Sequence, residues 1–146
     1  MTLVVADLNG LKDVNETLGH AAGDALLRRA GEVLNEAVSK PRHAARIGGD
    51  EFVVMMPASS AEEGVQMIAT IEELVEVNNQ FYPGSRLSFA LGIATAEPGE
   101  RLEDAVRRAD QQMYAAKRAH YADPDRDRRR EVVNGAASPS DADRHA

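Results

Sequence analysis

An aspartate at position 7 ends a short apolar run, and a stretch with helical character begins three residues later at Gly10. The free backbone N–H groups and the dipole of a helix N-terminus favour phosphate, and a nearby carboxylate can hold a hard divalent cation that bridges to it. This pattern would suit the binding of a phosphorylated small molecule. Taken alone, Asp7 is more often a turn residue at the end of a strand, so the motif needs support from elsewhere in the chain.

A second candidate is the run Gly48-Gly49-Asp50-Glu51, which lies between two short stretches typical of strands. Paired glycines favour a hairpin turn, tolerate positive φ and let a ligand approach the backbone. Adjacent acids repel each other in a purely structural turn, whereas a metal ion or a general-base role would use them. Because side chains alternate along a strand, we expect Asp50 and Glu51 to point to different sides. A solvated hairpin tip is the alternative interpretation.

The two acidic features are most informative together. If the strand ending at Asp7 lies beside the hairpin, its carboxylate meets those of Asp50 and Glu51 near a helix start that can bind phosphate. This constellation predicts metal-assisted phosphoryl or nucleotidyl transfer. Lys12, on the first turn of the following helix, and Lys117, near the end of the last helix, could neutralise phosphate charge. A single lysine, however, is more often a solvated surface residue.

Hydrophobic periodicity outlines the elements that must position these residues. Ser60 and Glu63 have the spacing of a capping box, and Gly19 is placed to end the first short helix. The order strand-helix-helix-strand-strand-helix-strand-helix predicts an α+β fold, in which helices pack on a sheet with a central hairpin. The expected strands are residues 2–7, 44–47, 51–56 and 87–94, and the expected helices are residues 10–18, 21–38, 60–77 and 102–118.

Length and composition narrow the classes of protein. The 146 residues, of which 43% are hydrophobic, suffice for one domain, and the absence of cysteine excludes disulfides, zinc ribbons and a thiol nucleophile. The net charge of −7 disfavours a nucleic-acid surface, and no apolar run is long enough to span a membrane. We therefore expect a cytoplasmic domain, although a longer parent protein could be membrane-anchored. From residue 119 the composition turns polar, which predicts a domain over residues 1–118 and a disordered tail over residues 119–146.

Four motifs, in this order, resemble those of the GGDEF family of diguanylate cyclases. They are residues 7–16 (DLNGLKDVNE), 19–24 (GHAAGD), 46–52 (RIGGDEF) and 109–117 (ADQQMYAAK). The resemblance covers residues 2–118 and implies an α+β fold similar to class III nucleotidyl cyclases, with a ferredoxin-like core and an antiparallel or mixed sheet. It also implies that two GTP molecules condense into cyclic di-GMP with release of two pyrophosphates, using Mg²⁺ or Mn²⁺, in a homodimer whose protomers each bind one GTP.

The resemblance also implies roles for the acidic residues. By motif position, Asp7, the backbone carbonyl of Leu8 and Asp50 would bind metal, and Glu51 would assist them. Asp50 would in addition be the general base for the ribose 3′-hydroxyl. The catalytic set implied in this way consists of Asp50, Glu51, Lys12 and Lys117.

Substrate recognition is implied for a second group of residues. Asn15 and Asp24 would hydrogen-bond the guanine edge, with His20 in the wall of the same pocket. An ionised carboxylate accepts well from the N1–H and N2–H₂ donors of guanine, which agrees with a preference for guanine over adenine. Asp24 could equally stabilise the first turn of a helix through its dipole. The groups implied for the phosphates are Lys12, Lys117 and the backbone N–H groups of Gly10 and Leu11.

The chain departs from the family pattern in ways that leave a second hypothesis open. The helical segment that usually precedes the first strand is absent, and the glycine and basic residue expected after Lys117 are replaced by His120 and Tyr121. The Arg-x-x-Asp pattern of a product-inhibition site is also absent, since Ser39 and Arg42 stand there, so we expect no feedback inhibition of that kind. The alternative is a catalytically silent module that binds GTP, or serves in dimerisation or regulation beside a sensor or phosphodiesterase domain.

Overall fold

The computed structural model of the chain describes residues 1–122. The order of elements predicted from periodicity is confirmed. Among the described residues the elements are β1 (Thr2–Leu8), α1 (Leu11–Leu18), α2 (His20–Ala37), β2 (His43–Arg46), β3 (Glu51–Met56), α3 (Ala61–Phe81), β4 (Phe89–Thr95) and α4 (Leu102–Ala122).

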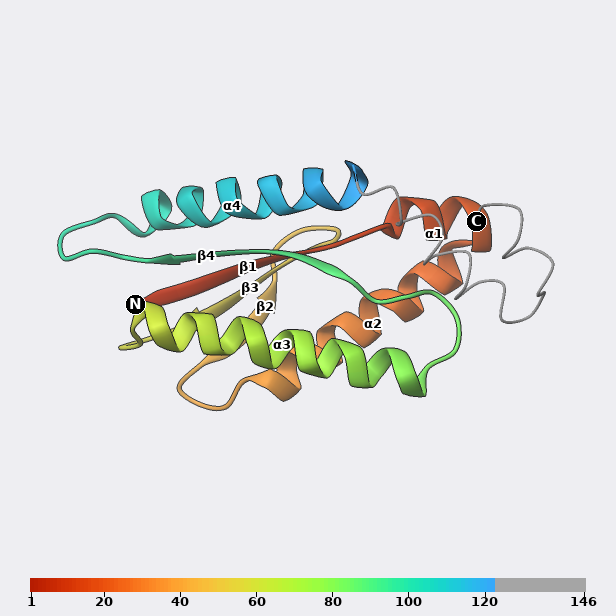
Figure 1. Ribbon diagram of the computed structural model, residues 1–146, viewed down its shortest axis with the longest axis horizontal. Coiled ribbons are helices and arrows are strands. Elements are labelled where there is room, and N and C mark those ends of the chain that lie inside the picture. Colours follow the sequence, from red (N-terminus) through yellow and green to blue (C-terminus); the bar gives the residue numbers. More distant parts are fainter. Residues whose placement is uncertain (123–146) are drawn as a thin grey trace.

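The strands form one antiparallel sheet in the order β2-β3-β1-β4. Helices α2 and α3 cover one face of this sheet and α4 covers the other, while α1 lies at the end where β1 stops (Figure 1). Each face therefore has its own apolar layer, as the expected α+β fold requires. The β2–β3 hairpin was expected at the centre of the sheet, but it lies at one edge, with β2 as the outermost strand. Among residues 1–122, no helix combines the length and the apolar character needed to cross a membrane.

Strand β1 lies in the middle of the molecule and is buried along its whole length. Its side chains alternate between the two layers: Val4 and Ala6 pack toward α2 and α3, whereas Leu3 and Val5 pack toward α4. The same alternation directs Asp7 to the α4 face. Near its end, a strand buried on both faces therefore directs the Asp7 carboxylate to the side of the sheet that α4 covers.

Strand β4 is covered on both faces as well. Phe89, Leu91 and Ile93 pack on the α2/α3 layer, while the small residues between them lie against α4. A Cβ at Gly92 would overlap the backbone of α4 at Ala109. The glycine therefore permits the close approach of α4 that brings its C-terminal half over the end of β1.

Three helix and strand boundaries differ from the prediction by two residues or more. Helix α3 continues to Phe81 rather than ending at 77, and β4 begins at Phe89 rather than at 87. Helix α4 continues to Ala122 rather than ending at 118, because no glycine or proline interrupts residues 119–122 and composition alone is a weak stop signal. Four residues of the predicted tail are thus helical, and the rest of it, residues 123–146, lies outside the described part of the chain.

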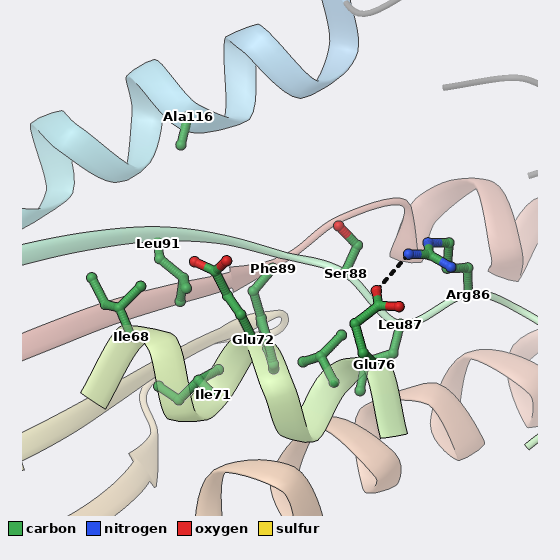
Figure 2. A pocket seen from close by; sticks show the side chains of 11 residues that line it. Ile68, Ile71, Glu72, Glu76, Arg86, Leu87, Ser88, Phe89, Leu91 and Ala116 are labelled. Atoms are coloured by element: carbon green, nitrogen blue, oxygen red, sulfur yellow. Dashed lines mark hydrogen bonds and ion pairs between the residues drawn. The ribbon is translucent and has the colours of Figure 1, made fainter. Parts of the chain in front are cut away.

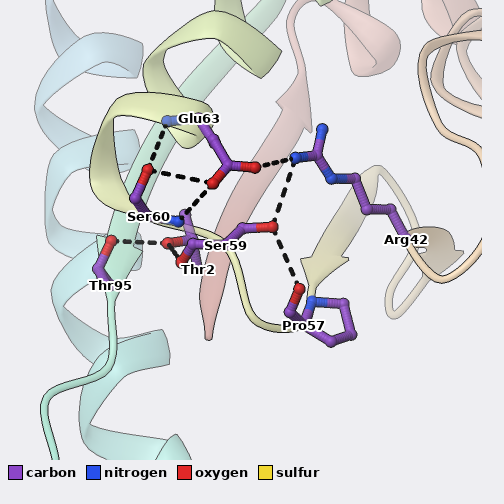
Figure 3. A network of polar contacts seen from close by, with 7 residues as sticks. All are labelled: Thr2, Arg42, Pro57, Ser59, Ser60, Glu63 and Thr95. Carbon is purple, nitrogen blue, oxygen red and sulfur yellow. Dashed lines mark hydrogen bonds and ion pairs between the residues drawn. The ribbon is translucent and has the colours of Figure 1, made fainter.

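Polar contacts fix the start of α3 against the sheet (Figure 3). The predicted capping box is present, with the Ser60 hydroxyl accepting from the Glu63 N–H and the Glu63 carboxylate accepting from the Ser60 N–H. Arg42 donates to the same Glu63 carboxylate at 2.6 Å. The Thr2 hydroxyl donates to the Ser59 carbonyl at 2.9 Å. Arg42 stands where members of the family that the chain resembles have the aspartate of the product-inhibition pattern. In this chain it helps to fix the start of α3.

A buried arginine fixes the other end of α3. Arg29 on α2 is 9% exposed and donates to the side-chain oxygens of Asn78 and Asn79 and to the backbone carbonyl of Ser85. Its guanidinium also lies 5.3 Å from the ring centre of Tyr82. Burial lowers the pKa of Arg29 below its ordinary value. One planar cation thus joins α2, the end of α3 and the loop that leads into β4.

We expect Arg29→Lys to lower the free energy of unfolding by about 1–3 kcal/mol, because an ammonium cannot reproduce the fork of donors and leaves buried oxygens unsatisfied. Urea denaturation with an unchanged m-value measures the effect. Arg28→Lys, at the exposed neighbouring position of the same helix, is the matched control and should change stability little. Equal stability of the two variants would contradict the anchoring role of Arg29.

Candidate active site

The acidic residues predicted from the two motifs meet at one end of the sheet. Asp7 and Glu51 stand opposite each other in the antiparallel register of β1 and β3. The backbone N–H of Leu8 donates to the carbonyl of Asp50 at 2.8 Å, which fixes the end of the hairpin against the end of β1. Opposed residues of an antiparallel pair point to the same face, so Glu51 shares the α4 face with Asp7. The structure thus brings Asp7, Asp50 and Glu51 to one edge.

Lys117 of α4 reaches into this cluster. Its Nζ donates to Asp7 Oδ1 at 2.6 Å and to the Leu8 carbonyl at 3.3 Å, and it lies 3.9 Å from Asp50 Oδ2. These oxygens are the groups that the family resemblance assigns to a metal ion. Lys117, the residue expected to hold phosphates, pairs its ammonium with these carboxylates in the structure.

The oxygens around Lys117 fit a hard divalent cation, because Mg²⁺ and Mn²⁺ prefer carboxylate and carbonyl ligands. The Lys117 ammonium contacts these oxygens and compensates part of their negative charge. Within residues 1–122, no three His, Asp or Glu side chains are gathered closely enough to hold a metal by themselves. Water or nucleotide phosphates would have to complete the coordination, which is the usual situation for Mg²⁺.

Burial and mutual repulsion perturb two of the carboxylates. Burial raises the pKa of Glu51 above its ordinary value, and the negative charges of Asp110, Asp7 and Asp50 raise it further. Burial also raises the pKa of Asp7, an effect that the hydrogen bond and charge of Lys117 offset only in part. Asp110 on α4 adds a buried Oδ1 without a hydrogen-bond partner. The site holds more negative charge than its protein surroundings neutralise, which favours binding of a cation.

The turn between β1 and α1 provides the expected backbone donors. Gly10 precedes α1 with φ 76° and ψ 11°, a left-handed conformation that favours glycine. Gly48 and Gly49, which tolerate positive φ, do not adopt it in the structure. The N–H of Gly10 donates to the hydroxyl of Tyr121 at 3.0 Å. Lys12 is 86% exposed and lies 4.0 Å from Glu16, outside the carboxylate cluster.

The residues expected to recognise guanine lie where α1 and α2 meet. A Cβ at the buried Gly23 would overlap the side-chain amide of Asn15, so the glycine allows Asn15 to pack directly on α2 beside Asp24. Asp24 and His20 are both exposed. Asp24 does not lie in the first turn of α2, which contains no acidic residue, so its interpretation as a helix-dipole residue is wrong. The Asp24 carboxylate is thus exposed, next in sequence to the glycine on which the half-buried Asn15 packs.

A cavity of about 440 Å³ lies elsewhere, along β4 between α3 and α4 (Figure 2). Its walls are mainly apolar, and Glu76 and Arg86 form an ion pair at its rim. It includes none of the residues expected to bind metal, phosphate or guanine. This cavity is therefore separate from the charged cluster.

Comparison with known proteins identifies the family. The family model described as "Diguanylate cyclase, GGDEF domain" matches residues 1–122. The chain belongs to the GGDEF family. It is 36% identical over 121 residues to the diguanylate cyclase DgcP of Pseudomonas aeruginosa, and 41% identical over 146 residues to an uncharacterized protein in the hutH 5′ region of Streptomyces griseus. These matches cover 82% and 95% of this chain.

Solved structures of GGDEF domains share the fold. The GGDEF domain of DgcB from Caulobacter crescentus, solved in complex with c-di-GMP, superposes with a TM-score of 0.73 at 30% identity, covering 81% of this chain and 72% of that one. The active GGEEF domain of a diguanylate cyclase from Vibrio cholerae gives a TM-score of 0.64 at 25% identity and covers 81% and 76%. The chain spans only 18% of the length of DgcP and 58% of the Streptomyces protein.

Several residues near the site of this GGDEF domain were missed by sequence reasoning. Asn9 is 5% exposed and bonds to Ser88 through both its backbone N–H and its side chain. Asp110 and Tyr121 lie seven residues before and four residues after Lys117, so helical periodicity counted from Lys117 could have found both. The contacts of Asn9, by contrast, depend on tertiary structure and leave no signal in the sequence.

We expect Gly23→Ala to weaken GTP binding about tenfold, because the new methyl group displaces the Asn15 amide from its position beside Asp24. Isothermal titration calorimetry measures the change. Gly31→Ala on the same helix is the matched control, since its Cβ would meet open space. Both substitutions favour helix, so the fold should not weaken on that account. Equal affinity of the two variants would show that Asn15 does not contact the base.

We expect Glu51→Gln to raise thermal stability at neutral pH. The pKa of Glu51 is raised in the folded chain by burial and neighbouring acids, so ionised Glu51 opposes folding once the pH exceeds the ordinary glutamate value. The gain should shrink as the pH falls through the raised pKa, and it should vanish below the ordinary value, where both folded and unfolded chains are protonated. Melting temperatures from pH 4 to 8 measure this difference.

Glu100→Gln is the control, and its effect on stability should have the opposite sign. The hydrogen bond from Arg108 lowers the pKa of Glu100 below its ordinary value. Glu100→Gln should therefore lose stability at neutral pH and approach the wild-type melting temperature in acid. A Glu51→Gln variant that behaves like Glu100→Gln would contradict the electrostatic description of the site.

Proposed function

We propose that this chain is a diguanylate cyclase domain that condenses two GTP molecules into cyclic di-GMP and releases two pyrophosphates. The observation that carries the proposal is the convergence of the Asp7 carboxylate, the Leu8 carbonyl and the Asp50 carboxylate on a single cation beside the start of α1. Oxygen ligands next to backbone donors suit a divalent metal bound to nucleotide phosphates. Membership of the GGDEF family supports the same chemistry.

Asp7, the Leu8 carbonyl and Asp50 would hold Mg²⁺ or Mn²⁺, with Glu51 assisting. When bound, such an ion withdraws charge from the phosphates and stabilises the charge that develops during nucleotidyl transfer. Glu51 lies between Asp7 and Asp110 on the α4 face, where its contribution is to the negative potential of the site. The raised pKa values of Asp7 and Glu51 reflect the same excess of negative charge.

Asp50 would act as the general base. Its side chain is 42% exposed at the end of the hairpin, so a ribose 3′-hydroxyl can approach it. The carboxylate takes the hydroxyl proton, the hydroxyl oxygen bonds to the α-phosphorus of the second GTP, and the bond from that phosphorus to the bridging oxygen breaks. Pyrophosphate leaves with the electron pair of that bond. A second step of the same kind closes the ring.

Asn15 and Asp24 would select guanine, with His20 at the wall of the pocket. The Asp24 carboxylate offers acceptors to N1–H and N2–H₂ of guanine, whereas adenine presents an acceptor at N1 and no N2 amine. Because the wrong base would leave the carboxylate without donors, the site should discriminate strongly between the two. The exposed positions of Asp24 and His20 on the first turns of α2 are consistent with this role.

The phosphates would be held by Lys117, Lys12 and the backbone N–H groups of Gly10 and Leu11. The Lys117 ammonium donates to the Asp7 carboxylate, which is also a proposed metal ligand. Because a metal ion held by Asp7 would repel the ammonium, Lys117 would then turn toward a phosphate oxygen. Lys12, almost fully exposed and separated from Glu16 by 4.0 Å, is free to turn toward the phosphates. Two cations and two amides then face the triphosphate.

Catalysis would require two protomers, because each binds only one of the two GTP molecules. A net charge of −7 on each chain opposes their association. A sensor or phosphodiesterase domain in a longer parent protein would supply the missing attraction or regulation. The chain's small share of the length of DgcP leaves room for such a domain in related proteins.

We expect the chain to convert GTP into cyclic di-GMP in the presence of Mg²⁺, with a specific activity that rises with protein concentration as dimers form. Asp50→Asn should reduce product formation by about 100-fold or more, because it removes both the base and a metal ligand. Asp104→Asn, at an exposed surface ion pair of α4, is the matched control and should retain activity. Chromatographic quantification of product over a range of protein concentrations measures both effects.

The same experiment separates the cyclase from a silent module. Binding of GTP without product at any protein concentration would favour a regulatory or dimerisation domain. Absence of GTP binding altogether would contradict both proposals. Equal activity of the Asp50→Asn and Asp104→Asn variants would contradict the role of Asp50.

A further inference from the structure

Three consecutive backbone N–H groups at the end of β1 are each bonded to a different element. Leu8 N–H donates to the Asp50 carbonyl and Asn9 N–H donates to the Ser88 carbonyl, both at 2.8 Å. Gly10 N–H donates at 3.0 Å to the side-chain hydroxyl of Tyr121 on α4. The first two bonds join backbone to backbone within the sheet and its adjoining loop. The third bond can be exchanged by rotation of one side chain.

Tyr121 and Lys117 act from the same face of α4, because residues four apart in a helix are neighbours. Lys117 places a cation against the Asp7 carboxylate, and Tyr121 places an oxygen against the Gly10 N–H. The Lys117 Nζ lies 5.9 Å from the centre of the Tyr121 ring, a distance at which the two side chains attract each other. Helix α4 therefore presents a cation and an oxygen where a metal ion and a phosphate oxygen would bind.

We propose that Tyr121 sets the nucleotide affinity of this site by occupying the Gly10 N–H in the nucleotide-free chain, so that a phosphate must displace its hydroxyl to bind. This inference rests on the proposed function, in which the Gly10 N–H is a phosphate donor. An anionic phosphate oxygen is a stronger acceptor than a phenol, so the nucleotide wins the exchange. Binding nevertheless requires the hydrogen bond between Gly10 and Tyr121 to break. The nucleotide affinity is therefore lower than it would be if the Gly10 N–H were not bonded to Tyr121.

Removing only the hydroxyl isolates this competition. Tyr121→Phe keeps the ring and its attraction to Lys117 but leaves the Gly10 N–H open to water. We expect the nucleotide dissociation constant of this variant to fall by about two- to tenfold, the equivalent of one hydrogen bond. Tyr114→Phe is the matched control, because Tyr114 lies on the same helix and is 62% exposed. The hydroxyl that accepts from the Gly10 N–H is that of Tyr121, not that of Tyr114. Its dissociation constant should equal that of the wild type.

The experiment uses the full 146-residue chain and calorimetric titration with α,β-methylene-GTP and Mg²⁺. The methylene group replaces the bridging oxygen at the bond that breaks, so binding is measured without turnover. Amide hydrogen exchange of Gly10, followed by NMR in the nucleotide-free chain, reports the contact independently. We expect faster exchange at Gly10 in Tyr121→Phe than in the wild type or in Tyr114→Phe.

The possible outcomes distinguish a failure of the Tyr121 inference from a failure of the proposed function. Tighter binding together with faster Gly10 exchange supports the proposal. Unchanged or weaker binding by Tyr121→Phe would show that the hydroxyl is neutral or helps to orient Gly10, and it would overturn the inference while the proposed function stands. Unchanged exchange at Gly10 would overturn it as well, because the contact would be absent. If neither wild type nor variant binds the analogue, the proposed function fails and the inference fails with it.

Discussion

The ion pair between Lys117 and Asp7 joins the last helix to the first strand, and the arrangement of the candidate site depends on it. The two residues are 110 positions apart, and their contact at 2.6 Å requires α4 to lie close against the sheet along most of its length. That close approach depends in turn on Gly92, where any side chain would overlap the α4 backbone. The ion pair is thus the end point of a packing constraint that begins in β4.

The surroundings of this ion pair lower the stability of the fold but favour the binding of a cation. The sheet end concentrates carboxylates in partly buried positions, and one ammonium does not neutralise them, so the pKa values of Asp7 and Glu51 are raised. A purely structural sheet end would be more stable with neutral side chains. Negative charge that the protein leaves uncompensated, however, is available to a cation that arrives with a substrate. The uncompensated negative charge that lowers stability at the sheet end would therefore also attract the metal ion of a metal-bound nucleotide.

Much of this could be predicted from the sequence, and the exceptions have physical reasons. The short apolar run that ends at Asp7 and the spacing of Ser60 and Glu63 are local signals, and the strand and the capping box are both present. The end of α4 at Ala122 was missed because a polar composition resembles a tail even where the backbone stays helical. The sequence shows which glycines tolerate positive φ but not which of them adopt it, and in the structure Gly10 does while Gly48 and Gly49 do not.

The remaining features of the site depend on contacts between distant segments, which no local pattern encodes. The packing of Asn15 on Gly23 and the bond from Gly10 to Tyr121 both join separate elements. The β1–α1 turn illustrates the consequence. The amides of Leu8 and Asn9 are held by backbone carbonyls that belong to the sheet and its loop, so the turn cannot change shape without disrupting the fold. The amide of Gly10 is held by a side chain at the end of a helix, so it can change partner while the turn stays fixed. A rigid turn with one exchangeable donor is the arrangement that a site needs if it is to bind and release an anion repeatedly at little cost in reorganisation.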